Sequence, residues 1–285
     1  MEMMMFSKVH KIEPNKVIDF YLNQNGIAKK HKDNIDKIKS AILNDAKIYK
    51  ILAISSSLNA VKAMISIITD DEKKSLELLY KHYLDKSGVR QLIFSQSLIC
   101  IGCQKNYATD RSTMDHFLPS SNYPNFYVLP WNLVPTCGDC NRIKNDVVPI
   151  TKDDNLPHPY FNLLMFKKNW LKIVISQNKP LKYYFSFDDK LRQSERKMIL
   201  NHLVAYKLEN VFVSHISTLF AEHDEDFREI FEREGSQNLK SYIDTLKNES
   251  YISPGRKKKY LPINIEHTFL SALSESNWFS SNYYI

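Results

Sequence analysis

The sequence has no apolar run long enough to cross a membrane, which takes about 18–20 continuous apolar residues. The longest candidate, Ile51–Ile68, is interrupted by serines, an asparagine and a lysine, so we expect a buried helix there. Residues Met1–Lys11 lack the basic start, apolar centre and small-residue cleavage site of a signal peptide. These absences favour a cytoplasmic protein with no membrane partner.

Glycine is also scarce, with 6 copies in 285 residues, so few positions interrupt a helix. Helical periodicity covers residues 13–88 and about 190–250, and a final helix is expected over Ile265–Ser276. Two short runs rich in β-branched and aromatic residues, Leu171–Ser176 and Leu181–Phe187, flank an Asn-Lys-Pro turn and predict a hairpin.

Seven of the 17 glycines and prolines gather in the middle of the chain. The cluster comprises Gly102, Pro119, Pro124, Pro130, Pro135, Gly138 and Pro149. Such a composition predicts a loop-rich module that is held together by something other than a large core. We therefore expect an N-terminal helical region (1–90), a central module (91–150), and a C-terminal region (151–285) with a strand pair followed by helices.

The net charge of +7 indicates attraction to polyanions in general but says nothing about the fold. The most basic stretch is Arg256–Lys259. It could contact nucleic acid, or it could be a solvated turn, and the sequence favours neither.

Only four cysteines occur, and all lie within 41 residues, as Cys100-Ile-Gly-Cys103 and Cys137-Gly-Asp-Cys140. Each Cys-x-x-Cys pair can turn two sulfurs toward one point, and two pairs complete a tetrahedral site that suits Zn2+. Four protein ligands leave no open position, so this zinc would be structural. An iron–sulfur cluster and a redox dithiol are the alternative interpretations.

Polar residues with the right chemistry for phosphodiester hydrolysis lie between and just after the cysteine pairs. The sequence contains Asp115-His116-Phe-Leu-Pro119, then Asn132-Leu-Val-Pro, and then Asn141-Arg-Ile-Lys144 directly after Cys140. Over residues 100–149 this order, CxxC…DHxxP…NLVPxCxxCNxxK, resembles the HNH (ββα-metal) endonuclease family. The resemblance implies an α+β fold: a mainly helical protein with a zinc-clamped ββα-metal module in its middle.

The resemblance also implies roles for individual residues. His116 is the candidate general base, because imidazole titrates near neutral pH. Asp115 and Asn141 are candidate oxygen ligands for one catalytic Mg2+ or Mn2+, although Asn141 stands where the family name has a second histidine. Asn132 would brace the intervening loop. Arg142 and Lys144 are candidate phosphate contacts.

The expected function is therefore metal-dependent cleavage of nucleic acid, with double-stranded DNA as the family's usual substrate. By analogy with similar stand-alone HNH proteins, the chain would be the effector nuclease of an antiphage (antiviral) defence system with an ATPase partner. The alternative is a non-catalytic zinc module that binds nucleic acid or a partner protein.

Overall fold

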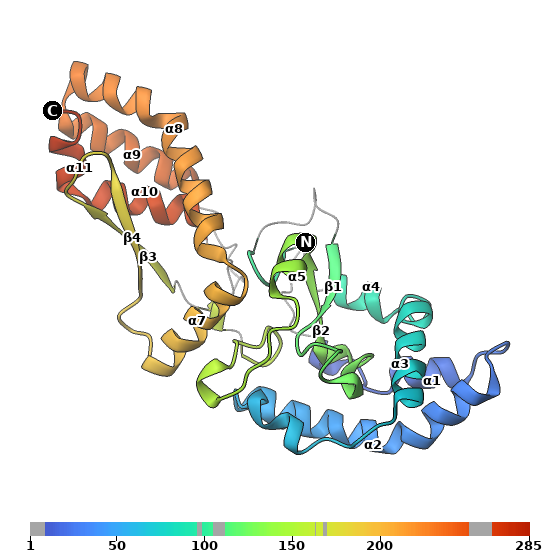
Figure 1. Ribbon diagram of the computed structural model, residues 1–285. Helices are drawn as coiled ribbons and strands as arrows, with labels where there is room; N and C mark the ends of the chain where they lie inside the picture. Colours follow the sequence, from blue (N-terminus) through green and yellow to red (C-terminus); the bar gives the residue numbers. More distant parts are fainter. Residues whose placement is uncertain (1–8, 96–98, 105–111, 163, 168–169, 251–263) are drawn as a thin grey trace. The chain divides into compact units, whose positions relative to one another are not determined.

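The computed structural model describes residues 9–285 except 96–98, 105–111, 163, 168–169 and 251–263 (Figure 1). The basic stretch Arg256–Lys259 lies outside the described residues. The chain forms two compact units: Met1–Leu164 with Lys197–Tyr206, and Met165–Arg196 with Lys207–Ile285. Helices dominate both units and each contains one two-stranded antiparallel sheet, which confirms the predicted α+β, mainly helical fold.

The first unit begins with four α-helices. They are α1 (Lys16–Leu22), α2 (Lys29–Ile54), α3 (Asp70–Tyr83) and α4 (Val89–Phe94). The start of α3 is fixed by a capping box: the Glu72 amide donates to the Thr69 hydroxyl, and the Thr69 amide donates to the Glu72 carboxylate. Buried aliphatic and aromatic side chains of α2 and α3, including Ile38, Tyr49 and Leu76, form the core of this unit.

The prediction of one buried helix over Ile51–Ile68 is wrong. Helix α2 ends at Ile54, and the 3-10 helix η2 spans Leu58–Ala63. The three serines between them explain the break, because serine hydroxyls bond locally to the backbone and compete with helical hydrogen bonding; Ser55 and Ser57 both donate in this way. Ile67 is fully exposed. No helix among the described residues is long and apolar enough to span a membrane.

The sheet of the first unit lies in the predicted module. Strands β1 (Ser112–His116) and β2 (Leu133–Cys137) are antiparallel, with Asp115 opposite Val134 and His116 opposite Leu133. Helix α5 (Gly138–Lys144) follows β2 directly and packs against both strands. This strand–loop–strand–helix order has the ββα form that the resemblance implies.

The regions expected at 1–90 and 91–150 lie in a single compact unit, so the boundary expected at residue 90 does not separate units. Buried polar contacts join them. The Asp45 carboxylate on α2 accepts hydrogen bonds from Ser66 and, at 2.6 Å, from Nδ2 of Asn125. The Tyr80 hydroxyl on α3 donates to the Met114 carbonyl on β1 at 3.0 Å.

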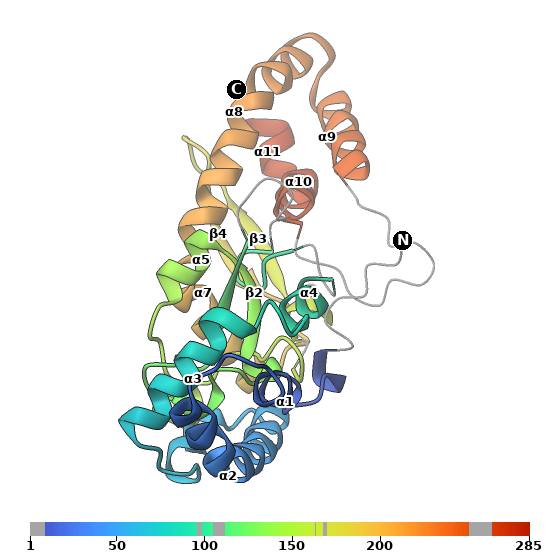
Figure 2. The ribbon, with the colours of Figure 1, turned by 90° about the vertical axis from the view of Figure 1, so that its right-hand side faces the viewer.

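The second unit contains the predicted hairpin, formed by β3 (Leu171–Ser176) and β4 (Lys182–Phe187). Its helices are α8 (Leu208–Glu234), α9 (Ser236–Ser250), α10 (Ile265–Glu275) and α11 (Asn277–Asn282). Helices α8, α9 and α10 pack on one another, and α10 packs on β3 (Figures 1 and 2). The predicted hairpin, the break near Gly235 and the final helix are therefore confirmed.

Two short helices join the units along the chain. Helix α6 spans Leu164–Lys167, and α7 spans Gln193–Ala205. The part of α7 from Lys197 onward groups with the first unit, although it lies far from the module in sequence. It therefore contributes side chains to the site described next.

Candidate metal centre and active site

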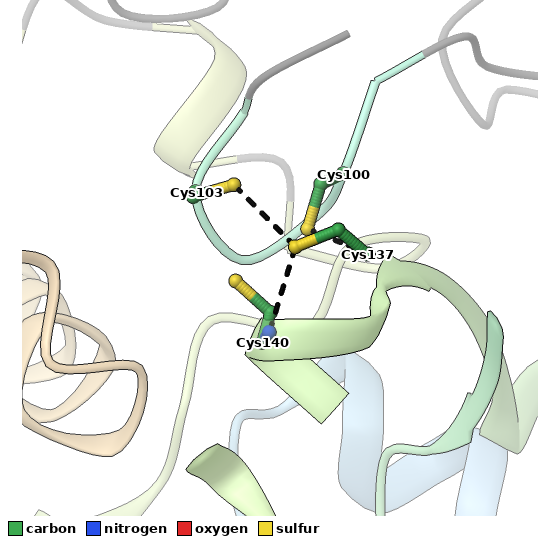
Figure 3. A group of neighbouring side chains, drawn as sticks. All are labelled: Cys100, Cys103, Cys137 and Cys140. Atoms are coloured by element: carbon green, nitrogen blue, oxygen red, sulfur yellow. Dashed lines mark hydrogen bonds between the residues drawn. The ribbon is translucent and has the colours of Figure 1, made fainter. Parts of the chain in front are cut away.

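The four cysteine sulfurs form one buried cluster (Figure 3). All four lie within 4.8 Å of one another, and Sγ of Cys103 is 3.9 Å from Sγ of Cys137. A disulfide needs about 2.05 Å between sulfurs. A tetrahedral zinc with Zn–S bonds of about 2.3 Å needs about 3.8 Å. The spacing therefore fits four separate sulfurs around one ion, and the cluster could hold zinc.

The local backbone also suits thiolate ligands. The Cys137 amide donates to Cys100 Sγ at 3.3 Å, and the Cys140 amide at the start of α5 donates to Cys137 Sγ at 3.5 Å. Hydrogen bonds from the neighbouring sulfurs, Cys100 first, lower the pKa of Cys137. Hydrogen bonds with Cys103 and Cys137, together with burial, raise the pKa of Cys100. Four adjacent thiolates therefore require a cation to be charged together.

Helix α7 covers one side of this cluster. Nε2 of the buried His202 donates to the Gly102 carbonyl at 2.9 Å, because a carbonyl can only accept. The Tyr206 ring lies against the Cys100–Cys103 turn: a Cβ atom at Gly102 would come within 2.8 Å of both Cys140 Sγ and Tyr206 Cδ1. The turn therefore requires glycine at this position for reasons of space.

Gly102→Ala is expected to lower zinc content and melting temperature together, because the added methyl group must displace a ligand sulfur or the Tyr206 ring. Metal analysis and thermal unfolding of the purified variant measure both. Gly26→Ala is the control: it meets nothing within 4 Å but is strained at φ +76°, so it should lower stability and leave zinc content unchanged. Full zinc content in Gly102→Ala would contradict the packing argument.

Asp115 and Lys144 form a buried ion pair in the ββα unit. Lys144 Nζ lies 2.9 Å from Asp115 Oδ2 and donates to the His116 carbonyl at 2.8 Å. Asp115 Oδ2 therefore has the Lys144 ammonium as its partner. Burial raises the pKa of Asp115 despite the opposing effect of Lys144. This carboxylate oxygen could bind a metal ion only after the Lys144 ammonium moves away from it.

The two candidate phosphate contacts point in different directions. The Lys144 side chain is fully buried, whereas the Arg142 side chain is exposed and pairs with Asp139 at 2.6 Å. The geometry therefore favours Lys144 as a residue that positions Asp115. Of the two, Arg142 is the one whose side chain lies at the surface, where a phosphate can contact it.

The His116 imidazole lies between aromatic rings at the end of β1. Tyr80 of α3 is 4.7 Å away between ring centroids, and Tyr127 is 5.3 Å away. Nε2 of His116 donates to the Tyr127 carbonyl at 2.9 Å, which leaves Nδ1 as the nitrogen without a proton. Burial lowers the pKa of His116 to about 4. The ring is therefore neutral at pH 7 with Nδ1 as its proton-accepting nitrogen, but a group with this pKa is a weaker base than an ordinary imidazole that titrates near neutral pH.

Asn141 and Asn132 have different surroundings. Nδ2 of Asn141 donates to the Thr113 hydroxyl at 3.0 Å, so the carbonyl oxygen is the atom left to bind a cation. Thr113 and Asp115 lie on the same face of β1 because strand side chains alternate, which brings Asn141 to the Asp115 side of the unit. Asn132 is fully buried and bonds the backbone of Leu118.

Several residues around the site were not predicted from the sequence: Tyr49, Tyr80, His158, His202 and Tyr206. All lie outside the motif and reach it only through the tertiary fold, so motif spacing carries no signal for them. His158 and His202 are both buried.

The chain is 31% identical over 147 residues to Protein ea31 of Escherichia phage lambda, and the match covers 49% of this chain and 49% of that protein. The chain thus spans about half the length of the curated relative that it matches. No family model matches. No solved structure matches. The function is therefore inferred from the side chains of the site itself, above all Asp115, His116 and Asn141.

Proposed function

We propose that this chain is an HNH endonuclease that hydrolyses phosphodiester bonds of DNA with a divalent metal. The observation that supports this most is the ββα unit, in which β1 carries Asp115 and His116 and α5 carries Asn141. The three side chains offer a carboxylate oxygen, an unprotonated imidazole nitrogen and an amide oxygen. That is the set that metal-assisted hydrolysis of a phosphodiester requires.

In this mechanism His116 activates the attacking water. Nδ1 accepts a proton from the water, the water oxygen bonds to phosphorus, and the bond to the leaving 3′ oxygen breaks. The hydrogen bond from Nε2 to the Tyr127 carbonyl holds the ring in the tautomer that this step needs. Asp115 and Asn141 would hold Mg2+ or Mn2+, which when bound supplies positive charge at the phosphate and the leaving oxygen.

Zinc at the four cysteines would have a separate, structural role. All four positions of a tetrahedral ion are taken by protein sulfurs, so none is left for water or substrate. Cys137 ends β2 and Cys140 lies in the first turn of α5. Zinc would therefore fix the angle between β2 and α5, and with it the position of Asn141 relative to β1.

Double-stranded DNA is the proposed substrate, and an ATPase is the proposed regulatory partner in antiphage defence. Both proposals rest on the resemblance to the HNH family. Cleavage assays with plasmid, single-stranded DNA and RNA test the first. Copurification of the chain with its genomic neighbours, assayed with and without ATP, tests the second.

One observation favours a second candidate function, a non-catalytic zinc module that binds nucleic acid or protein. The Asp115 side chain is only 7% exposed, and the Lys144 ammonium lies against it. A cation can reach Asp115 only if Lys144 shifts. If the ion pair persists in the presence of Mg2+ or Mn2+, the unit cannot perform the proposed reaction.

Asp115→Asn discriminates between the two functions. It keeps the size of the side chain but removes its charge, so we expect Mn2+-dependent plasmid cleavage to fall by about a hundredfold or more and to need more Mn2+. Asp139→Asn is the matched control, because among the described residues this exposed carboxylate on α5 pairs with Arg142 at the surface; its cleavage should be close to that of the wild type. Equal metal-dependent cleavage by both variants would contradict the proposal.

A further inference from the structure

Three buried polar side chains from distant parts of the first unit form a continuous hydrogen-bonded chain. They are Tyr49 on α2, Asn132 just before β2, and His158 beyond the module. The Tyr49 hydroxyl is 3.1 Å from Asn132 Oδ1 and 2.9 Å from His158 Nε2. In the sequence, Tyr49 is 83 residues from Asn132 and 109 residues from His158.

The direction of each hydrogen bond follows from its partners. His158 Nδ1 accepts the Tyr160 amide proton at 3.1 Å, so the proton of the neutral ring is on Nε2. Nε2 then donates toward the Tyr49 oxygen, and the Tyr49 hydroxyl proton is left to donate to Asn132 Oδ1. Burial lowers the pKa of His158 to about 3, so this arrangement does not change near neutral pH.

Asn132 uses every hydrogen-bonding position of its amide. Oδ1 accepts from Tyr49 and, at 2.8 Å, from the Leu118 amide. Nδ2 donates to the Leu118 carbonyl at 3.0 Å and to the Phe126 carbonyl at 3.4 Å. A fully bonded, buried amide cannot rotate without losing several hydrogen bonds at once.

These contacts hold the backbone that follows His116. The Phe117 amide donates to the Asn132 backbone carbonyl at 2.7 Å, and the Leu118 amide to its side chain. The His158 ring packs on Phe117 with 4.5 Å between ring centroids. Phe117 and Leu118 follow His116 directly in the chain, so they fix the backbone at His116. Both are hydrogen-bonded to Asn132, which is linked in turn to Tyr49 and His158.

We propose that Tyr49 and His158 are positioning residues of the nuclease site, which orient Asn132 and through it the backbone that carries the His116 general base. This inference rests on the proposed function. It assigns a role in catalysis to the N-terminal helical region and to the segment after the module. Small displacements of a reacting group cost large factors in rate, so the chain of hydrogen bonds is expected to affect turnover more than DNA binding.

Tyr49→Phe tests the proposal. It removes the hydroxyl but keeps the ring, which packs edge-on against Phe126 at 4.9 Å, so the variant should fold. Tyr21→Phe is the matched control, because the Tyr21 side chain is equally buried and its hydroxyl has no hydrogen-bond partner among the described residues. Zinc content and circular dichroism of both variants should equal those of the wild type.

Two measurements are made on each protein. Cleavage kinetics well below the melting temperature should show a roughly ten- to hundredfold fall in kcat for Tyr49→Phe, with KM for DNA changed by less than about twofold. Amide hydrogen exchange should be at least about tenfold faster at Leu118 in Tyr49→Phe than in Tyr21→Phe. A purely structural role would lower stability without this split between kcat and KM.

The exchange measurement separates the two proposals. Faster exchange at Leu118 in a protein that never cleaves DNA would support the coupling and contradict the proposed function. Equal exchange and equal kcat in the two variants would overturn the positioning role and leave the proposed function intact. If Tyr49→Phe does not fold, His158→Phe, which keeps a ring against Phe117 but removes the donor toward Tyr49, replaces it with the same two readouts.

Discussion

His116→Ala should abolish metal-dependent DNA cleavage, with a loss of at least about a hundredfold, because a positioned general base contributes a factor of about 10² to 10⁴. Zinc content should not change, since the described hydrogen bond of the imidazole is to the Tyr127 carbonyl and not to the cysteine cluster. Plasmid cleavage in Mg2+ or Mn2+, together with metal analysis of the same sample, provides the measurement.

His82→Ala is the control for that variant. His82 is an exposed histidine on α3, the helix that also carries Tyr80, so its loss should leave cleavage unchanged. Added imidazole should restore part of the activity of His116→Ala, because the substitution leaves a space of imidazole size between Tyr80 and Tyr127. Cleavage at the wild-type rate by His116→Ala would sink the proposed mechanism.

Local patterns in the sequence predict most of the secondary structure and the cysteine cluster. The two Cys-x-x-Cys pairs specify their own geometry, and the β-branched and aromatic runs on either side of Asn178–Pro180 specify the hairpin. The predicted helix over Ile51–Ile68 is wrong because its apolar content matters less than the serine triplet. The serine hydroxyls hydrogen-bond to the local backbone and end α2. Hydrophobicity alone does not distinguish a continuous helix from a helix end followed by an exposed turn.

The inward position of Lys144 was within reach of sequence reasoning. On a helix, residues three apart share a face and adjacent residues do not. Asn141 and Lys144 are three apart on α5, so a site that uses Asn141 also receives Lys144, while Arg142 points elsewhere. Lys144 and Arg142 therefore lie on different faces of α5 and are not equivalent as phosphate contacts. Lys144 lies on the face of Asn141, where it pairs with the buried Asp115.

The supporting residues could not have been predicted in this way. Tyr49 meets His158 across 109 residues, and His202 meets Gly102 across 100. Such contacts depend on how helices pack in the first unit, which no local spacing encodes. The motif therefore specifies the candidate site residues, whereas the contacts that hold them come from the helices packed around it.

Cys137→Ser is expected to abolish zinc binding and to unfold the module. Besides offering its sulfur as a ligand, Cys137 makes two hydrogen bonds within the cluster. Its amide donates to Cys100 Sγ, and its sulfur accepts from the Cys140 amide in the first turn of α5. Binding of a structural zinc is worth about 10–16 kcal/mol in small zinc domains, which is as large as the whole stability of a typical folded protein. Three remaining sulfurs hold zinc far more weakly, so β2 and α5 lose their connection.

The consequence should be confined to the first unit. Hydrogen exchange in β1, β2 and α5 is expected to become as fast in Cys137→Ser as in wild-type protein stripped of zinc by a chelator, and cleavage should be lost in both. Protection in α8, α9 and α10 should persist, because these helices pack within the second unit. A Cys137→Ser protein with one bound zinc and wild-type protection in α5 would show that the four sulfurs do not act together as a metal site.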